Sequence, residues 1–347
     1  MKKIFALVMA MVMLSLCILS ASAAVDVEQS EKRVFKNSDT TLPYRLILPE
    51  NYDETKSYPM LVFLHGAGER GNDNKLQLFH CVQYLANNLP ECIIVAPQCP
   101  VGNQWVDTPW ANGAYSIERV KESNELKAVV ELLDDLQEEF NVDADRIYAS
   151  GLSMGGFGAW DLMMRHNDYF AAGILVCGGG DPSQAEKLVD TPLFVFHGDA
   201  DDAVPVSGSR DTVQAIKDAG GQLVKYVEYP GQGHGIWNNA FAHTGMLKEL
   251  LTYRLSERYP DKGTEESTPE ESTPAESAPA ESTPEESAPA ENAESVTETA
   301  SAPAESIAES AEESAISPIL LTLSVLGFAL PACTVIVVLL IAKKKQQ

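Results

Sequence analysis

Two kinds of hydrophobic pattern alternate along residues 25–260. Residues 58–64 and 92–96 are nearly unbroken apolar runs, which is typical of parallel strands that are covered on both faces. Residues 116–140 instead repeat apolar positions every three or four residues, which predicts a helix. By the same patterns, further strands are expected at residues 44–48, 147–149, 172–177, 192–197 and 223–229, and further helices at residues 76–89, 157–166, 212–219 and 241–254.

This alternation predicts an α/β fold in one domain, with a mostly parallel central sheet and helices on both faces. In such a sheet the functional site lies beyond the carboxyl ends of the strands. Four expected strand ends carry glycine-rich or polar segments, namely residues 65–67, Ser153, residues 199–202 and His234. We therefore expect the site where these four segments meet.

Residues 1–23 have the pattern of a secretory signal peptide. Lys2 and Lys3 precede an apolar run over residues 4–19, and Ala21-Ser22-Ala23 supplies the small residues of a cleavage site. A retained membrane helix is the alternative, and the small residues favour cleavage.

Residues 318–342 are almost continuously apolar and long enough to cross a bilayer. Three lysines follow directly, at residues 343–345. Because positive charge stays on the cytoplasmic side, this order predicts a single-pass helix, a cytoplasmic tail at residues 343–347 and a domain at the outer face of the plasma membrane. The alternative is an apolar helix that packs on the domain. The separation of this segment from the domain along the sequence argues against such packing, and so do the lysines that follow it.

A low-complexity tract at residues 261–317 connects the domain to this segment. Proline recurs every five residues from Pro269 to Pro289, and residues 264–315 contain 15 Glu without Lys or Arg. Such a tract has too little apolar surface to offset the entropy cost of ordering, which predicts an extended, disordered stalk. The net charge of −25 argues against nucleic acid and anionic lipid as partners.

Four cysteines fall within the expected domain, at positions 81, 92, 99 and 177. They are consistent with buried free thiols or with disulfides, and sequence alone does not choose among the pairings. No C-x-x-C or histidine-rich spacing indicates a metal site.

The strongest chemical motif lies in residues 146–160, which read R-I-Y-A-S-G-L-S-M-G-G-F-G-A-W. A strand, a tight G-x-S-x-G turn and a helix in this order form a nucleophile elbow, with Ser153 as the nucleophile. Gly151 and Gly155 lack the Cβ atoms that such a sharp turn would bring into collision. The alternative is an ordinary glycine-rich turn between a strand and a helix.

A serine nucleophile needs a base, an acid that orients the base, and donors for the oxyanion. His234 follows the last expected strand in a glycine-rich loop, and we favour it as the base over His243, which lies in a helical pattern. The acid is left among Asp199, Asp201 and Asp202, all after the strand that ends at residue 197. The order serine, aspartate, histidine is that of α/β-hydrolases.

Two backbone N–H groups are expected to bind the oxyanion. One belongs to Met154, which follows the nucleophile directly. The other is expected from the turn after residue 64, at Ala67 or, as the alternative, at Gly68.

Four motifs together resemble a known family: F-L-H-G-A-G-E-R-G, D-R-I-Y-A-S-G-L-S-M-G-G, F-H-G-D-A-D-D-A-V-P and G-H-G-I-W. They are similar to secreted esterases related to carbohydrate esterase family 1, to polyhydroxyalkanoate depolymerases and to prolyl-oligopeptidase-like hydrolases, over residues 33–256. The resemblance implies an α/β-hydrolase fold and a serine carboxylic-ester hydrolase without a cofactor. It also selects Asp201 as the acid, with Asp202 in reserve and Asp199 as a cap of the loop.

The substrate is less sharply indicated. No large insertion separates the elbow from the acid, which favours an open cleft and esters carried on a polymer, such as acetyl or feruloyl groups on polysaccharide. Trp105, Trp110 and Trp237 either line this cleft or pack in the core, and Trp237 and Trp105 are the candidates for substrate binding. A prolyl-oligopeptidase-like peptidase, a phospholipase or thioesterase, and a catalytically inactive surface binding module are the alternatives, and we expect a monomer.

Overall fold

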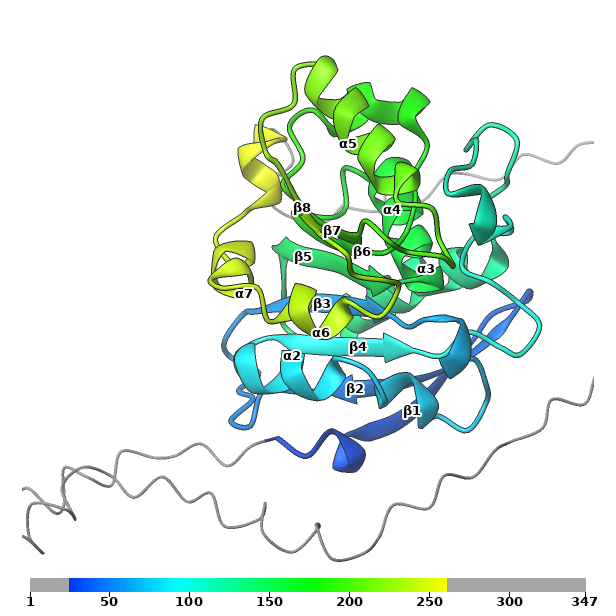
Figure 1. Ribbon diagram of the computed structural model, residues 1–347. Helices are drawn as coiled ribbons and strands as arrows, with labels where there is room; N and C mark the ends of the chain where they lie inside the picture. Colours follow the sequence, from blue (N-terminus) through cyan, green and yellow to red (C-terminus); the bar gives the residue numbers. More distant parts are fainter. Residues whose placement is uncertain (1–24, 261–347) are drawn as a thin grey trace, which may run out of the picture. The chain divides into compact units, whose positions relative to one another are not determined.

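The computed structural model describes residues 25–260 (Figure 1). The predicted signal peptide, stalk, membrane helix and cytoplasmic tail lie outside the described residues. Within the described part, no helix is both long and apolar enough to cross a membrane.

An eight-stranded sheet forms the centre of the domain, in the order β1-β2-β4-β3-β5-β6-β7-β8. The strands β3 to β8 run parallel to one another, whereas β2 is antiparallel to both of its neighbours. The bounds are β1 Glu31–Lys36, β2 Thr41–Ile47, β3 Tyr58–Leu64, β4 Ile93–Pro97, β5 Val142–Leu152, β6 Ala172–Val176, β7 Leu193–Gly198 and β8 Val224–Tyr229.

Helices cover both faces of this sheet, as Figure 1 shows. Side chains of β3 alternate between two separate cores, Met60 and Val62 in one and Leu61 and Phe63 in the other. The first core includes α3, α4 and α5, and the second includes α2, α6 and α7. This arrangement confirms the predicted fold class. The helix bounds are α2 Val82–Asn88, α3 Asn124–Glu139, α4 Met154–Arg165, α5 Ser207–Asp218, α6 Trp237–Phe241 and α7 Met246–Leu250, with short 3-10 segments η1 Val27–Gln29, η2 Ala67–Glu69, η3 Leu76–Leu78, η4 Trp110–Asn112, η5 Pro182–Leu188 and η6 Leu255–Glu257.

Four predicted helices differ from the observed ones, and α5 begins at Ser207, five residues before the expected start. The helix expected at residues 76–89 is divided into η3 and α2, because Cys81 takes a left-handed conformation with φ 62°. The helix expected at residues 241–254 is likewise broken before α7 at Gly245, with φ 79°. The helix expected at residues 116–140 begins only at Asn124, where the side chain of Ser123 caps it by accepting from the amide of Leu126.

Strand β1 was not predicted from the hydrophobic pattern. Its sequence E-K-R-V-F-K is mostly charged, and its side chains are exposed or half-buried. It pairs antiparallel with β2 at the edge of the sheet, where charged residues discourage further strand pairing.

Candidate active site

The predicted elbow is formed where β5 ends and α4 begins. Ser153, between them, has φ 53° and ψ −120°, a conformation that a non-glycine residue rarely adopts. A Cβ atom added at Gly151 would lie 2.0 Å from the carbonyl oxygen of Gly155, and one added at Gly155 would lie 1.9 Å from that of Leu64. Both glycines are therefore required by the close approach of backbone at this turn, as predicted.

The structure brings Ser153, His234 and Asp201 into one chain of hydrogen bonds. The distance from His234 Nε2 to Ser153 Oγ is 2.7 Å, and that from His234 Nδ1 to Asp201 Oδ2 is also 2.7 Å. Because the carboxylate can only accept, Nδ1 carries the proton and Nε2 is free to accept from the serine hydroxyl. His243 lies apart from this chain, with its ring 5.4 Å from that of Phe196. This geometry is the one a general base and its orienting acid require.

Donors surround the carboxylate of Asp201. The amides of Ala203 and Val204 donate to Oδ1 at 2.9 and 2.8 Å. Its side chain is fully buried, and burial by itself would raise the pKa of Asp201; the hydrogen bonds from His197, His234 and Val204 outweigh burial and hold this pKa well below the usual range. Asp201 therefore stays ionised opposite His234.

The two neighbouring aspartates have other surroundings. Asp202 is exposed, and Asp199 accepts a hydrogen bond from the amide of Gly231 at 2.5 Å. Since Gly231 lies in the loop that carries His234, Asp199 ties that loop to the end of β7, in agreement with its predicted role as a cap.

His197 was not predicted as part of the site. It is completely buried, and its Nε2 lies 3.1 Å from the same Oδ2 atom of Asp201 that His234 contacts. Its Nδ1 lies 2.8 Å from Ser209 Oγ, which also lies 2.9 Å from the carbonyl oxygen of Gly178. The available signal was its position four residues before Asp201 in the H-G-D-A-D motif, at the end of a buried strand. Two histidines thus share one aspartate.

The predicted oxyanion donors both begin short helical segments. Met154 is the first residue of α4 and Ala67 is the first residue of η2, so their N–H groups have no acceptor within these segments. Gly66, Ala67 and Gly68 line the same cleft as Ser153. The arrangement leaves two backbone donors close to the nucleophile, as oxyanion binding demands.

His65 fixes the turn that carries Ala67. Its Nδ1 donates to the carbonyl of Gly66 at 2.6 Å, and its Nε2 accepts from the amide of Cys99 at 2.9 Å. Burial lowers the pKa of His65 to about 4, so the ring is neutral at pH 7 and keeps this one tautomer.

The tryptophans divide between core and cleft. Trp105 is completely buried and donates from Nε1 to the carbonyl of His65 at 3.0 Å, so the prediction that it binds substrate is wrong: it supports the turn from behind. Trp237 and Trp110 do line the cleft. The ring of Trp237 lies edge-on to that of His234, with centroids 5.6 Å apart.

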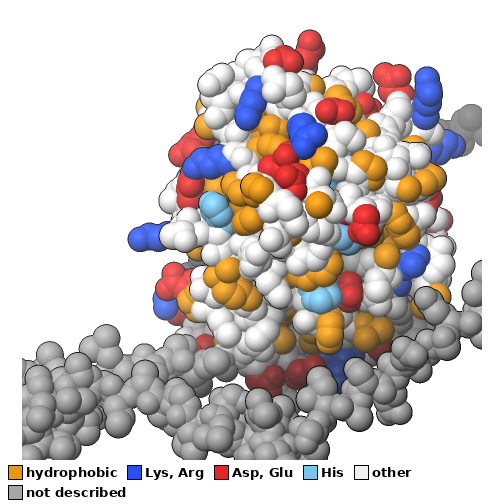
Figure 2. Space-filling model, viewed as in Figure 1, with side chains coloured by type: hydrophobic (Ala, Val, Ile, Leu, Met, Phe, Trp, Pro, Cys, Tyr) orange, Lys and Arg blue, Asp and Glu red, His pale blue; other side chains and the backbone are white. Residues whose placement is uncertain are grey.

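The cleft around Ser153 has a volume of about 350 Å³. Figure 2 shows histidine and acidic side chains beside apolar ones on the face of the domain where α6 lies. The lining of the cleft combines the oxyanion turn, the base and aromatic side chains with one further carboxylate, that of Glu69. The lining residues are Gly66, Ala67, Gly68, Glu69, His80, Trp110, Leu152, Ser153, Ala203, Val204, His234 and Trp237.

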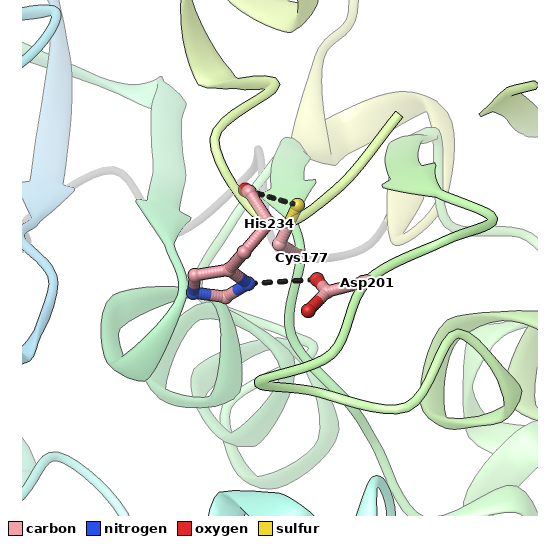
Figure 3. A group of neighbouring side chains, drawn as sticks. All are labelled: Cys177, Asp201 and His234. Carbon is pink, nitrogen blue, oxygen red and sulfur yellow. Dashed lines mark hydrogen bonds and ion pairs between the residues drawn. The ribbon is translucent and has the colours of Figure 1, made fainter. Parts of the chain in front are cut away.

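Cys177 lies beside Asp201 and His234, and Figure 3 shows the three together. One ligand atom from each lies within 4.8 Å of the others, which is compatible in spacing with a metal site. The thiol, however, donates to the carbonyl of His234 at 3.3 Å, and burial raises the pKa of Cys177 to about 12. Metal binding needs a thiolate and a free imidazole nitrogen, whereas here Nδ1 of His234 is engaged with Asp201. The donors fit a catalytic chain better than a metal.

The other three cysteines of the domain are buried as well. Cys81, Cys92, Cys99 and Cys177 are all buried and unpaired, so of the two alternatives the structure has free thiols.

Comparisons with known proteins agree with this geometry. A model of a family described as phospholipase/carboxylesterase matches residues 51–247, more than half of the chain. The solved structure of a thermostable esterase is similar with a TM-score of 0.58 and 34% sequence identity, and the match covers 66% of this chain and 64% of that one.

Curated relatives include both a peptidase and an esterase. Dipeptidyl-peptidase 5 of Porphyromonas gingivalis is 28% identical over 59% of this chain, and the chain spans only 35% of that protein's length. A probable feruloyl esterase C of Aspergillus terreus is 24% identical over 55% of this chain and 67% of its own.

Proposed function

From the premise that the chain belongs to the phospholipase/carboxylesterase family and is a serine hydrolase of the α/β-hydrolase type, we propose that it removes acetyl or feruloyl groups from polysaccharide hydroxyls. The hydrogen-bonded chain of Ser153, His234 and Asp201 carries the proposal, with both of its bonds at 2.7 Å. The similarity to a probable feruloyl esterase and the aromatic lining of the cleft support the substrate class.

In the first half of the reaction, Ser153 Oγ attacks the ester carbonyl while His234 Nε2 takes its proton. The negative charge that develops on the carbonyl oxygen is bound by the N–H groups of Met154 and Ala67. Asp201 stabilises the imidazolium that forms on His234. As the tetrahedral intermediate collapses, His234 returns the proton to the leaving alcohol oxygen, and an acyl-Ser153 remains.

In the second half, His234 takes a proton from water, and the resulting hydroxide attacks the acyl-Ser153 carbonyl. The same two N–H groups bind the second oxyanion. Collapse breaks the bond to Ser153 Oγ, which recovers its proton from His234, and the carboxylic acid leaves.

Replacement of the nucleophile tests this scheme. Ser153→Ala should lower kcat on 4-nitrophenyl acetate by several powers of ten, because no acyl-enzyme can form. A fluorophosphonate probe should label the wild-type protein and not the variant. Labelling that persists in Ser153→Ala contradicts the assignment, and absence of labelling and turnover in the wild type supports a binding module instead.

A peptidase is the second candidate, because of the similarity to dipeptidyl-peptidase 5. The same groups could cleave an amide if His234 protonated the departing nitrogen. Rates on acetylated and feruloylated xylo-oligosaccharides, compared with the rate on a dipeptide anilide, separate the two. Faster turnover of the anilide would replace the esterase proposal.

We further propose that the protein is held at the outer face of the plasma membrane by residues 318–342, with the domain on the stalk of residues 261–317. The apolar run, the three lysines after it and the acidic, proline-rich tract support this placement. Cells that produce the chain shortened after residue 262 should release the domain to the medium, while the full chain stays with the membranes. Equal release of both would contradict the anchor.

A further inference from the structure

Glu69 lies in the active-site cleft, directly beside the oxyanion turn. It is the last residue of η2, and only 9% of its surface is exposed. A Cβ atom placed at Gly66 would lie 3.0 Å from Glu69 Oε2 and 3.6 Å from Ser153 Cβ. The carboxylate and the nucleophile therefore flank the same point of the turn.

The backbone of Glu69 is fixed by hydrogen bonds, whereas its carboxylate accepts none from the described residues. The amide of Glu69 donates to the carbonyl of Gly66 at 3.3 Å, and Gln98 Nε2 donates to the carbonyl of Glu69 at 3.1 Å. Among residues 25–260, no side chain or amide donates a hydrogen bond to the carboxylate. The nearest basic group is His80 Nε2, 3.6 Å from Oε1, which is longer than a hydrogen bond.

A carboxylate in this position has two costs. Burial without donors is unfavourable for a charged group. In addition, its negative charge opposes the negative charge that develops on the oxyanion close by. Both costs fall when a substrate brings an O–H or N–H group to Glu69, so the arrangement suits a substrate that carries such a donor near its ester.

Aromatic rings line the same cleft as this carboxylate. The rings of His80 and Trp237 lie 5.1 Å apart, and Trp110 lines the same cleft. Apolar ring faces combined with a few fixed polar groups are the usual means of orienting a small ligand. A sugar ring matches both features, because its C–H faces can pack on the aromatic rings while its hydroxyls point to the carboxylate.

We propose that Glu69 accepts a hydrogen bond from a free hydroxyl next to the esterified oxygen, so that the preferred substrates are monoesters of vicinal diols, as in a sugar ring. This inference rests on the proposed esterase function and names the alcohol side of its substrate. Glu69 is then a residue that determines specificity, separate from the chain of Ser153, His234 and Asp201.

The test uses two acetates that differ by one hydroxyl: cyclohexyl acetate and the monoacetate of trans-1,2-cyclohexanediol. Each kcat/KM is divided by the rate of hydroxide-catalysed hydrolysis, which removes the intrinsic effect of the hydroxyl. The wild-type protein should prefer the diol monoester by about 10- to 100-fold, the range expected of a hydrogen bond to a charged group. Glu69→Gln should lose most of this preference, and Glu69→Ala should lose all of it.

Glu91→Gln is the matched control, since Glu91 is exposed and lies outside the cleft, and it should keep the wild-type preference. Fluorophosphonate labelling shows whether each variant has an assembled site. Equal corrected rates on the two acetates in the wild type would overturn the role of Glu69 while leaving the esterase function intact. Failure on both acetates and on 4-nitrophenyl acetate would instead remove the proposed function itself.

A third ester separates hydroxyl from cation recognition. The cyclohexyl ester of alanine carries an ammonium on the acyl side of the bond. If the wild type prefers this ester to both acetates, and Glu69→Gln loses that preference, Glu69 binds an amine and the inference about diols is wrong.

Discussion

The loop after β7 and the turn after β3 each place a carboxylate at the active site, and the two carboxylates differ in the hydrogen bonds that they accept. Asp201, in the first, accepts from two histidines and two backbone amides. Glu69, in the second, receives no hydrogen bond to its carboxylate from the described residues, with His80 at 3.6 Å. A buried charge that the protein itself satisfies is held in one state and one place, whereas one that it leaves unsatisfied is available to a ligand.

The largest expected effect follows from Asp201→Asn. An amide can donate to Nδ1 of His234 and so favours the wrong tautomer, and kcat on 4-nitrophenyl acetate should fall by about 10⁴-fold. Asp202→Asn is the matched control, because Asp202 is exposed, and it should remain within about twofold of the wild type. A large loss of activity in Asp202→Asn and a small one in Asp201→Asn would show that Asp202 is the acid.

Removing one donor from Asp201 should have a smaller effect. His197→Gln takes away the ring that contacts Oδ2 at 3.1 Å, and we expect kcat to fall by about 10- to 100-fold while KM changes little. Because a hydrogen bond that lowers the pKa of Asp201 is lost, this pKa should rise, and activity should decline at a higher pH on acidification than in the wild type. An unchanged pH profile with a lower melting temperature would indicate a purely structural role for His197.

The hydrogen bonds that Asp201 accepts should also make the stability of the protein depend on pH. The pKa of Asp201 is lower in the folded protein than in the unfolded chain, so its stabilising contribution is fully present above about pH 5 and is lost as pH falls below about 4. The loss continues as pH falls toward the folded pKa, so melting curves between pH 2 and 7 should show it in the wild type and a weaker one in Asp201→Asn. Equal slopes for the two proteins would mean that Asp201 is not the group that titrates.

The smallest expected effect is the change in melting temperature caused by Glu69→Gln. Replacing a mostly buried carboxylate that accepts no hydrogen bond from the described residues by an amide of the same shape lowers the cost of burial, so the melting temperature should rise by about 1–3 °C at pH 7. Asp201→Asn should lower it under the same conditions. A fall for Glu69→Gln would mean that its carboxylate has a stabilising partner and that the contrast between the two loops is wrong.

Several features of the fold and the site could be predicted because they depend on short stretches of chain. The alternation of apolar runs and helical patterns identified β3 to β8 and most helices. The elbow at Ser153 follows from collisions between atoms only a few residues apart, as at Gly151. By contrast, β1 was missed because its charged sequence forms a strand only through pairing with β2.

The amino-acid sequence by itself determined the order of the elements, the strained turn at Ser153 and the presence of His234 in a loop after the last strand, since each depends on local sterics or on periodicity. Only the tertiary structure decided what surrounds each side chain. It buried Trp105 behind the oxyanion turn, brought His197 against Asp201 and left the Glu69 carboxylate without a donor among residues 25–260. Burial and hydrogen bonding of this kind are set by residues that are distant along the chain and adjacent only after folding, as with Trp105 and His65, 40 residues apart.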